Sequence, residues 1–225
     1  ERDEAEFVVN QIRDWVSRGG NRRDTAILYR SNAQSRVFEE YLLAARIPYR
    51  VYGGLRFFER QEIKDALAYL RLIANRDDDA SFERVVNLPT RGIGARTLEV
   101  LRAYAKAHSV SLWQSATPCA GDLGARATAC LQAFLQLIDK LDADTRELPL
   151  HEQVDHVIQA SGLAGHYQKD KADKGEARLE NLDELVSAAR GFEPEDGDMS
   201  PLMAFLSHAV LESGEGQAEA WEDCV

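Results

Sequence analysis

Helical spacing of apolar residues is the feature that most constrains the fold of this 225-residue chain. Residues 59–74 repeat apolar side chains every three or four positions, which places them on one face of a helix. These side chains are Ile63, Leu67, Leu70 and Ile73. Comparable patterns predict further helices at about 80–87, 94–107, 124–142, 150–160, 176–190 and 200–212. We therefore expect a mainly α-helical fold.

The first part of the chain has a different pattern. It predicts helices at 4–18 and from about residue 32 to 46, and strands at 25–30 and 47–54. A strand, a helix and a strand in this order are typical of a small parallel α/β unit. We expect residues 1–52 to form an incomplete α/β portion and residues 53–225 to form a helical domain.

Charge and composition leave nucleic-acid binding open. The net charge is −11, but residues 180–225 carry twelve acidic side chains against one basic one, and the first 179 residues are balanced. The acidic total therefore says little about the middle of the chain. The cysteines and histidines have no metal-ligand spacing, so no metal site is expected. No run of 18 apolar residues predicts a membrane span. Because the first residue is Glu1, the chain is expected to be a piece of a longer polypeptide.

The stretch NLPTRGIGARTLEVL, residues 87–101, places two glycines and two arginines at the start of a predicted helix. A helix start exposes unpaired amides and the positive end of the helix dipole, so it suits phosphate. Gly92 and Gly94 would allow close approach, and Ile93 would anchor the turn in the core. The stretch is similar to a helix-hairpin-helix element that grips a DNA backbone. The alternative is a plain corner between two helices with solvent-facing arginines.

Three stretches carry a family resemblance. Residues 26–101, from AILYRSNAQS to ARTLEVL, resemble the UvrD/PcrA/Rep group of superfamily 1 DNA helicases. ARLENLDELVSAARGF (177–192) and residues 201–225 extend the similarity over essentially the whole chain. The resemblance implies that residues 1–52 are the start of a RecA-like motor subdomain, called 2A, and residues 53–225 a helical subdomain, called 2B.

The resemblance also implies a parent enzyme that unwinds DNA in the 3′-to-5′ direction, using ATP and Mg²⁺, in nucleotide excision and mismatch repair. This chain contains no G-x-x-x-x-G-K-[ST] phosphate loop. We therefore expect no ATP site, no catalytic residue and no cofactor within it. The implied partners are junctions of double- and single-stranded DNA, the remaining helicase subdomains, and repair proteins or a second protomer. The implied location is the bacterial cytoplasm, in association with the nucleoid.

Residue roles follow from the same resemblance. Contact with the duplex backbone is assigned to Thr90, Arg91, Gly92, Ile93, Gly94, Arg96 and Thr97. Contact with single-stranded DNA is assigned to Arg30 and Asn32, the alternative for Arg30 being a local ion pair with Glu39 or Glu40.

Two further pairs have competing interpretations. Gly53 and Gly54 are a candidate hinge, or a turn that ends a strand with Phe57 and Phe58 as core anchors. Asp78 and Asp79 either cap the next helix or restrain DNA binding as a regulatory element.

A second function stays open beside DNA contact. In that alternative the chain is a protein-interaction module that docks repair partners or another helicase protomer, with little direct DNA binding. Salt discriminates the two, because phosphate binding weakens steeply with salt.

Overall fold

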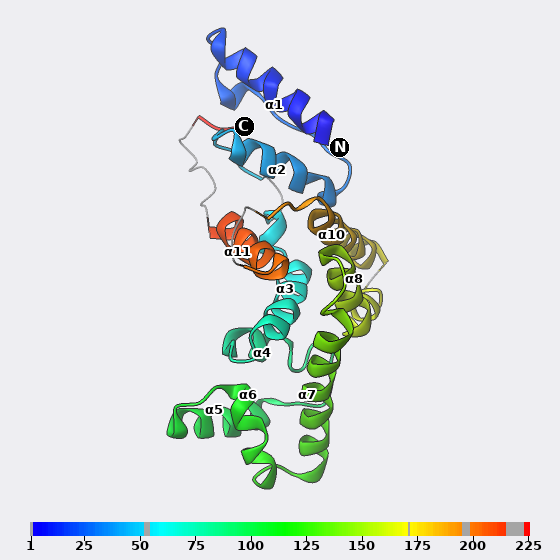
Figure 1. Cartoon of the computed structure of the whole chain (residues 1–225). Helices are drawn as coiled ribbons and strands as arrows, with labels where there is room; N and C mark the ends of the chain where they lie inside the picture. The colour runs from blue at the N-terminus through cyan, green and yellow to red at the C-terminus, as the bar shows by residue number, and fades with distance from the viewer. Residues whose placement is uncertain (1, 52–54, 171, 195–198, 215–222) are drawn as a thin grey trace. The chain divides into compact units, whose positions relative to one another are not determined.

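The computed structural model describes residues 2–51, 55–170, 172–194, 199–214 and 223–225. The chain divides into two compact units. The first contains Glu1–Arg60 and Ser207–Val225, and the second contains Gln61–Leu206. Figure 1 shows the helices of each unit. The expected division at residues 52 and 53 into two helicase subdomains stays a prediction.

Two helices pack together in the first unit, α1 (Arg2–Ser17) and α2 (Ser35–Ala44). Val9 and Ile12 of α1 share a small core with Leu42 of α2. The helices predicted at 4–18 and 32–46 are therefore confirmed. Short 3-10 turns complete the unit: η1 (Arg22–Asp24), η2 (Asn32–Gln34) and η3 (Phe57–Glu59).

The two strands predicted in the first unit do not form within the described residues. Residues 25–30 and 47–51 are irregular instead. A strand exists only when a neighbouring strand accepts its backbone hydrogen bonds, and no described segment supplies such a ladder. In the second stretch, Ile47 N donates to Leu42 O of α2 at 2.9 Å, Val225 N donates to Pro48 O at 3.0 Å, and Arg50 N donates to Val225 O at 2.9 Å. The prediction of a mainly α-helical fold is confirmed, and its two strands are wrong for the described part.

The second unit is helical throughout the residues that the structure describes there, and its helices follow the predicted order. They are α3 (Gln61–Ala74), α4 (Asp79–Val85), α5 (Ala95–His108), α6 (Leu112–Ala116), α7 (Ala125–Thr145), α8 (Leu150–Ala160), α9 (Leu163–Tyr167) and α10 (Ala172–Gly191), with the 3-10 turn η4 (Pro118–Gly121) after α6. Helix α11 (Pro201–Gly214) begins in the second unit and ends in the first. The sequence did not predict the short helices α6 and α9.

Helix α3 is the centre of the second unit. It packs against α4, α7, α8 and α10, and residues on every side of it are buried. Its residues with no more than 3% of their surface exposed are Ile63, Asp65, Ala66, Leu67, Ala68, Tyr69, Leu70 and Leu72.

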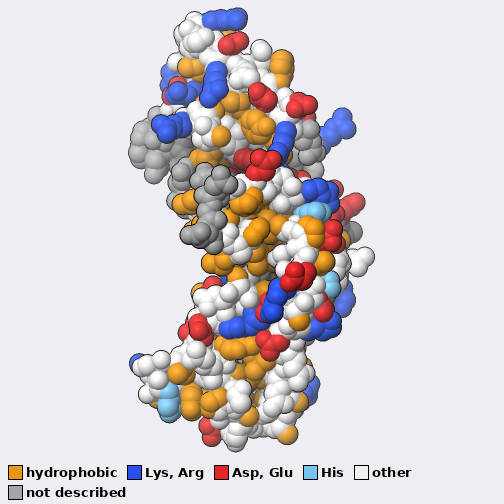
Figure 2. All heavy atoms as spheres, viewed as in Figure 1, with side chains coloured by type: hydrophobic (Ala, Val, Ile, Leu, Met, Phe, Trp, Pro, Cys, Tyr) orange, Lys and Arg blue, Asp and Glu red, His pale blue; other side chains and the backbone are white. Residues whose placement is uncertain are grey.

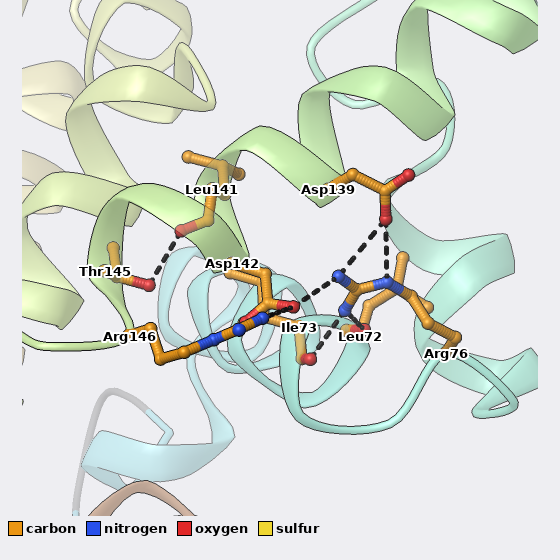
Figure 3. Close-up of polar contacts among 8 residues, drawn as sticks. All are labelled: Leu72, Ile73, Arg76, Asp139, Leu141, Asp142, Thr145 and Arg146. Carbon is orange, nitrogen blue, oxygen red and sulfur yellow. Dashed lines mark hydrogen bonds and ion pairs between the residues drawn. The ribbon is translucent and has the colours of Figure 1, made fainter.

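Arg76 joins the end of α3 to α7 (Figure 3). Its guanidinium donates to the carbonyl oxygens of Leu72 and Ile73 at 2.7 and 2.5 Å, which satisfies acceptors that the helix end leaves open. It also lies 3.3 Å from Asp139 and 3.1 Å from Asp142 of α7. These contacts help to fix α7, which supports the turn described next.

Candidate nucleic-acid interface

The candidate site is the turn between α4 and α5, residues 87–94. The predicted pair of helices around the Gly-Ile-Gly sequence is present. Ile93 is 1% exposed and anchors the turn in the core, as predicted. Gly92 has a φ of +81°, a left-handed conformation that favours glycine. A Cβ added there would lie 3.4 Å from Cys130 Sγ of α7, so α7 supports this point of the turn.

Gly94 differs from Gly92. It is the N-cap of α5, with φ −93° and ψ 176°, which any residue can adopt. No described heavy atom lies within 4 Å of the place a Cβ would take, so the space in front of Gly94 is open. This glycine is therefore not needed for backbone geometry, and its lack of a side chain leaves the start of α5 accessible.

Residues 92, 94, 95 and 96, at the start of α5, are exposed. Within the described residues, the amides of Gly92, Gly94, Ala95 and Arg96 donate to no acceptor. The first bonds to Gly94 O come from Thr97 N at 3.1 Å and Leu98 N at 3.3 Å. Unpaired amides together with the helix dipole make a site that favours an anion.

Asn87 shapes the turn from inside. Its side-chain Oδ1 accepts hydrogen bonds from Arg91 N at 2.8 Å and from Ile93 N at 3.2 Å. The amides of Arg91 and Ile93 thus donate to the protein, whereas those of Gly92 and Gly94 have no acceptor among the described residues. The sequence analysis missed this residue. The available signal was an asparagine directly after a helix, since its side chain commonly bonds nearby backbone in turns.

The arginines around the turn have different environments. Arg96 is exposed and forms no ion pair within the described residues. Arg102 is held by Glu83, with its Nη2 2.8 Å from Glu83 Oε2, and this hydrogen bond lowers the pKa of Glu83. Arg91 is half-buried and bonds to carbonyl oxygens of the protein. Of these three arginines, Arg91 and Arg102 therefore bond to groups of the protein, and Arg96 is exposed.

Of the two predicted threonines, Thr90 lies within the turn and Thr97 lies in α5. Thr90 is exposed, whereas Thr97 is 5% exposed and lies on the buried side of α5.

Basic and acidic side chains are interspersed within each unit on the face shown in Figure 2. A local anion site therefore accords better with this surface than a broad positive field.

Arg30 and Asn32 lie in the first unit. Ser31 is the N-cap of η2, and Gln34 Oε1 accepts from Arg30 N at 3.0 Å. The Arg30 side chain is exposed and has no ion pair in the described part of the chain, so the alternative pairing with Glu39 or Glu40 is not formed.

The carboxylates near Arg30 have other partners. Glu40 pairs with Arg36 at 2.7 Å. Glu39 is buried, accepts from Ser35 Oγ at 2.6 Å and from Phe57 N at 3.3 Å, and burial raises its pKa.

Gly53 and Gly54, the candidate hinge, lie outside the described residues. The segment after them is held firmly: Phe57 and Phe58 are 1% and 5% exposed, which confirms them as core anchors. Arg60, which the sequence analysis did not single out, donates to Asn32 O and to Ser35 Oγ, both at 2.7 Å. This buried arginine thus joins the segment after the glycines to the loop of Asn32.

Asp78 and Asp79 have structural partners. Asp78 is the N-cap of α4, and its carboxylate accepts from Ser81 N at 2.9 Å and from Ser81 Oγ at 2.8 Å. Asp79 Oδ1 accepts from Leu112 N at the start of α6 at 2.7 Å. The capping interpretation is therefore confirmed for Asp78. A regulatory role of this pair stays a prediction.

Other classes of site find no support in the described residues. No group of three or more His, Cys, Asp or Glu side chains there could hold a metal ion. No helix there is long and apolar enough to cross a bilayer.

Comparison with known proteins gives the family. The model of the UvrD-like helicase C-terminal domain matches residues 1–225. The chain is 58% identical to DNA helicase II of Escherichia coli over its whole length and 56% identical to that of Haemophilus influenzae. It is 40% identical to the ATP-dependent DNA helicase PcrA of Staphylococcus aureus over 86% of its length. The chain spans 32% of the Escherichia coli protein and 27% of the Staphylococcus aureus one. On this evidence the chain belongs to the UvrD-like helicase C-terminal domain family.

Proposed function

We propose that this chain supplies the duplex-DNA contact and a regulatory part of an ATP-dependent 3′-to-5′ DNA helicase of DNA repair. The observation that carries the proposal is the set of solvent-facing amides at 92 and 94–96, with the open space in front of Gly94. A phosphate group fits that site by charge and by hydrogen-bonding capacity. Family membership supports the same conclusion, because the relatives are named DNA helicases.

The contact is expected to be independent of sequence. In this proposal the backbone amides and Arg96 bond to phosphate oxygens and make no contact with base edges. Thr90, Gly92 and Gly94 of the turn are exposed, as are Ala95 and Arg96 at the start of α5. In the first unit, the exposed Arg30 and Asn32 are the proposed contacts to single-stranded DNA.

The remaining functions belong to the longer protein. ATP and Mg²⁺ would be bound outside this chain, which has no phosphate-loop sequence. Nucleotide excision and mismatch repair, and a place in the bacterial cytoplasm with the nucleoid, come with the helicase assignment. Gly53 and Gly54 would act as a hinge, and Asp78 and Asp79 would restrain unwinding.

One substitution separates binding from folding. Gly94→Val should place a side chain in the open space, and the extended backbone at Gly94 suits valine. Gly124→Val is a matched control, because Gly124 is also an exposed N-cap glycine with no atom within 4 Å of a Cβ, at the start of α7. Fluorescence anisotropy of a labelled hairpin with a 3′ tail, between about 20 and 200 mM salt, measures the affinity.

The proposal predicts salt-dependent binding by the unmodified chain, loss of binding in Gly94→Val, and retention in Gly124→Val. Equal loss in both variants would contradict a site at the α4–α5 turn. Absence of salt-dependent binding by the unmodified chain would contradict the DNA contact and favour the protein-interaction module.

A further inference from the structure

We propose that Asn87 and Arg91 are positioning residues. Through hydrogen bonds within the protein, they fix the α4–α5 turn in the conformation that binds DNA. In this proposal Arg91 does not touch phosphate, although the family resemblance places it among the DNA contacts. The inference rests on the proposed function and concerns the same site.

Arg91 makes three hydrogen bonds to carbonyl oxygens of the protein. Its Nη1 donates to Val85 O at 3.2 Å and to Pro89 O at 3.0 Å, and its Nη2 donates to Ser161 O at 2.8 Å. These acceptors belong to three segments: the end of α4, the turn itself, and the corner between α8 and α9. The guanidinium therefore ties the turn to two neighbouring elements.

Aromatic rings surround the same guanidinium. Its Cζ lies 5.7 Å from the ring centre of Tyr69 and 5.6 Å from that of Phe134. Tyr69 is fully buried, and its hydroxyl donates to Leu88 O at 2.5 Å. The positive charge is thus placed against ring faces and carbonyl oxygens, where it is stabilised without an external anion.

Asn87 performs the complementary task. Arg91 donates to the carbonyl oxygen of Pro89 in the turn, whereas Asn87 Oδ1 accepts from the turn amides of Arg91 and Ile93. With those two amides bound inside, the neighbouring amides of Gly92 and Gly94 are left to solvent. A site arranged in advance binds more tightly, because little ordering remains to be done on binding.

A positioning residue and a phosphate-contacting residue differ in their effect on the salt dependence of DNA binding. Each phosphate neutralised by a side chain adds about 0.9 to the slope of log K against log salt. Loss of a phosphate-contacting arginine therefore lowers both affinity and slope. Loss of a positioning residue lowers affinity and leaves the slope unchanged.

The test compares substitutions at Arg91 and Arg96 in the 225-residue chain with the labelled hairpin. Lysine keeps the charge but cannot form the planar fork that reaches several carbonyls. We expect Arg91→Lys and Arg91→Gln to weaken binding alike, by roughly tenfold, with the slope of the unmodified chain. Arg96→Gln should lower the slope by about 0.9, and Arg96→Lys should restore it.

Asn87→Ala provides a second route that removes no charge. It should weaken binding with an unchanged slope, and hydrogen exchange of the Arg91 and Ile93 amides should become faster. Circular dichroism of each variant shows whether the helices persist. If the Arg91 variants unfold, hydrogen exchange and DNA binding of Asn87→Ala still test the proposal.

The inference is overturned if Arg91→Lys binds like the unmodified chain while Arg91→Gln loses affinity and slope together. It is also overturned if Asn87→Ala binds DNA normally. Absence of salt-dependent binding by the unmodified chain would instead remove the proposed function, so the two failures are distinguishable.

Discussion

Gly92→Ala should destabilise the second unit because of backbone conformation and not because of crowding. A left-handed residue with a side chain costs about 1–2 kcal/mol, and alanine regains about 0.4–1 kcal/mol by restricting the unfolded chain. The added Cβ would meet Cys130 Sγ at 3.4 Å, which is ordinary contact. The expected net loss is therefore about 1 kcal/mol.

Gly94→Ala is the matched comparison. Its backbone conformation is open to any residue and its surroundings are empty, so the change in unfolding free energy should stay within about 0.5 kcal/mol. The two glycines of one short sequence are thus expected to have opposite roles. Gly92 serves the fold, and Gly94 serves access to the amides.

Urea unfolding measures both changes. In a background with Trp15→Phe and Trp221→Phe, fluorescence of Trp113 reports on the second unit, where its ring packs against Phe82. Equal unfolding free energies for Gly92→Ala and the parent, or an equal loss in Gly94→Ala, would refute the reasoning.

Two further predictions concern capping and pH. Asp78→Ala should cost the second unit about 1–2 kcal/mol, because α4 loses its N-cap, and an unchanged urea midpoint would contradict this. A hydrogen bond to Glu212 at 3.1 Å raises the pKa of His208. The resulting stability of the first unit should be complete below the unfolded pKa of about 6.5 and lost as pH rises through the higher folded pKa. Thermal unfolding of His208→Gln should lack this pH dependence, and an identical pH profile would count against it.

The helices could be predicted because their apolar spacing is a local property. Ile63, Leu67 and Leu70 mark α3 without reference to the rest of the chain. The strands could not be judged in this way. Residues 25–30 have the composition of a strand, but a strand forms only beside a partner strand, which local sequence does not reveal, and the described residues supply none.

The position of the α4–α5 turn was predicted, but the contacts of its side chains were not. The glycines and Ile93 identified the turn, since their roles follow from local geometry. The role of Arg91 depends on Ser161, seventy positions away, and no local pattern could reveal that contact. The sequence alone therefore did not show that Arg91 and Arg102 bond within the protein.

The most direct test of the central claim is an amide NMR titration of the chain with the unlabelled hairpin. The account predicts that the amide signals of Gly92, Gly94, Ala95 and Arg96 shift on binding, because these donors face solvent. The amides of Arg91 and Ile93, which donate to Asn87, should move far less. Shifts confined to other parts of the chain, with the α4–α5 turn unchanged, would contradict the account.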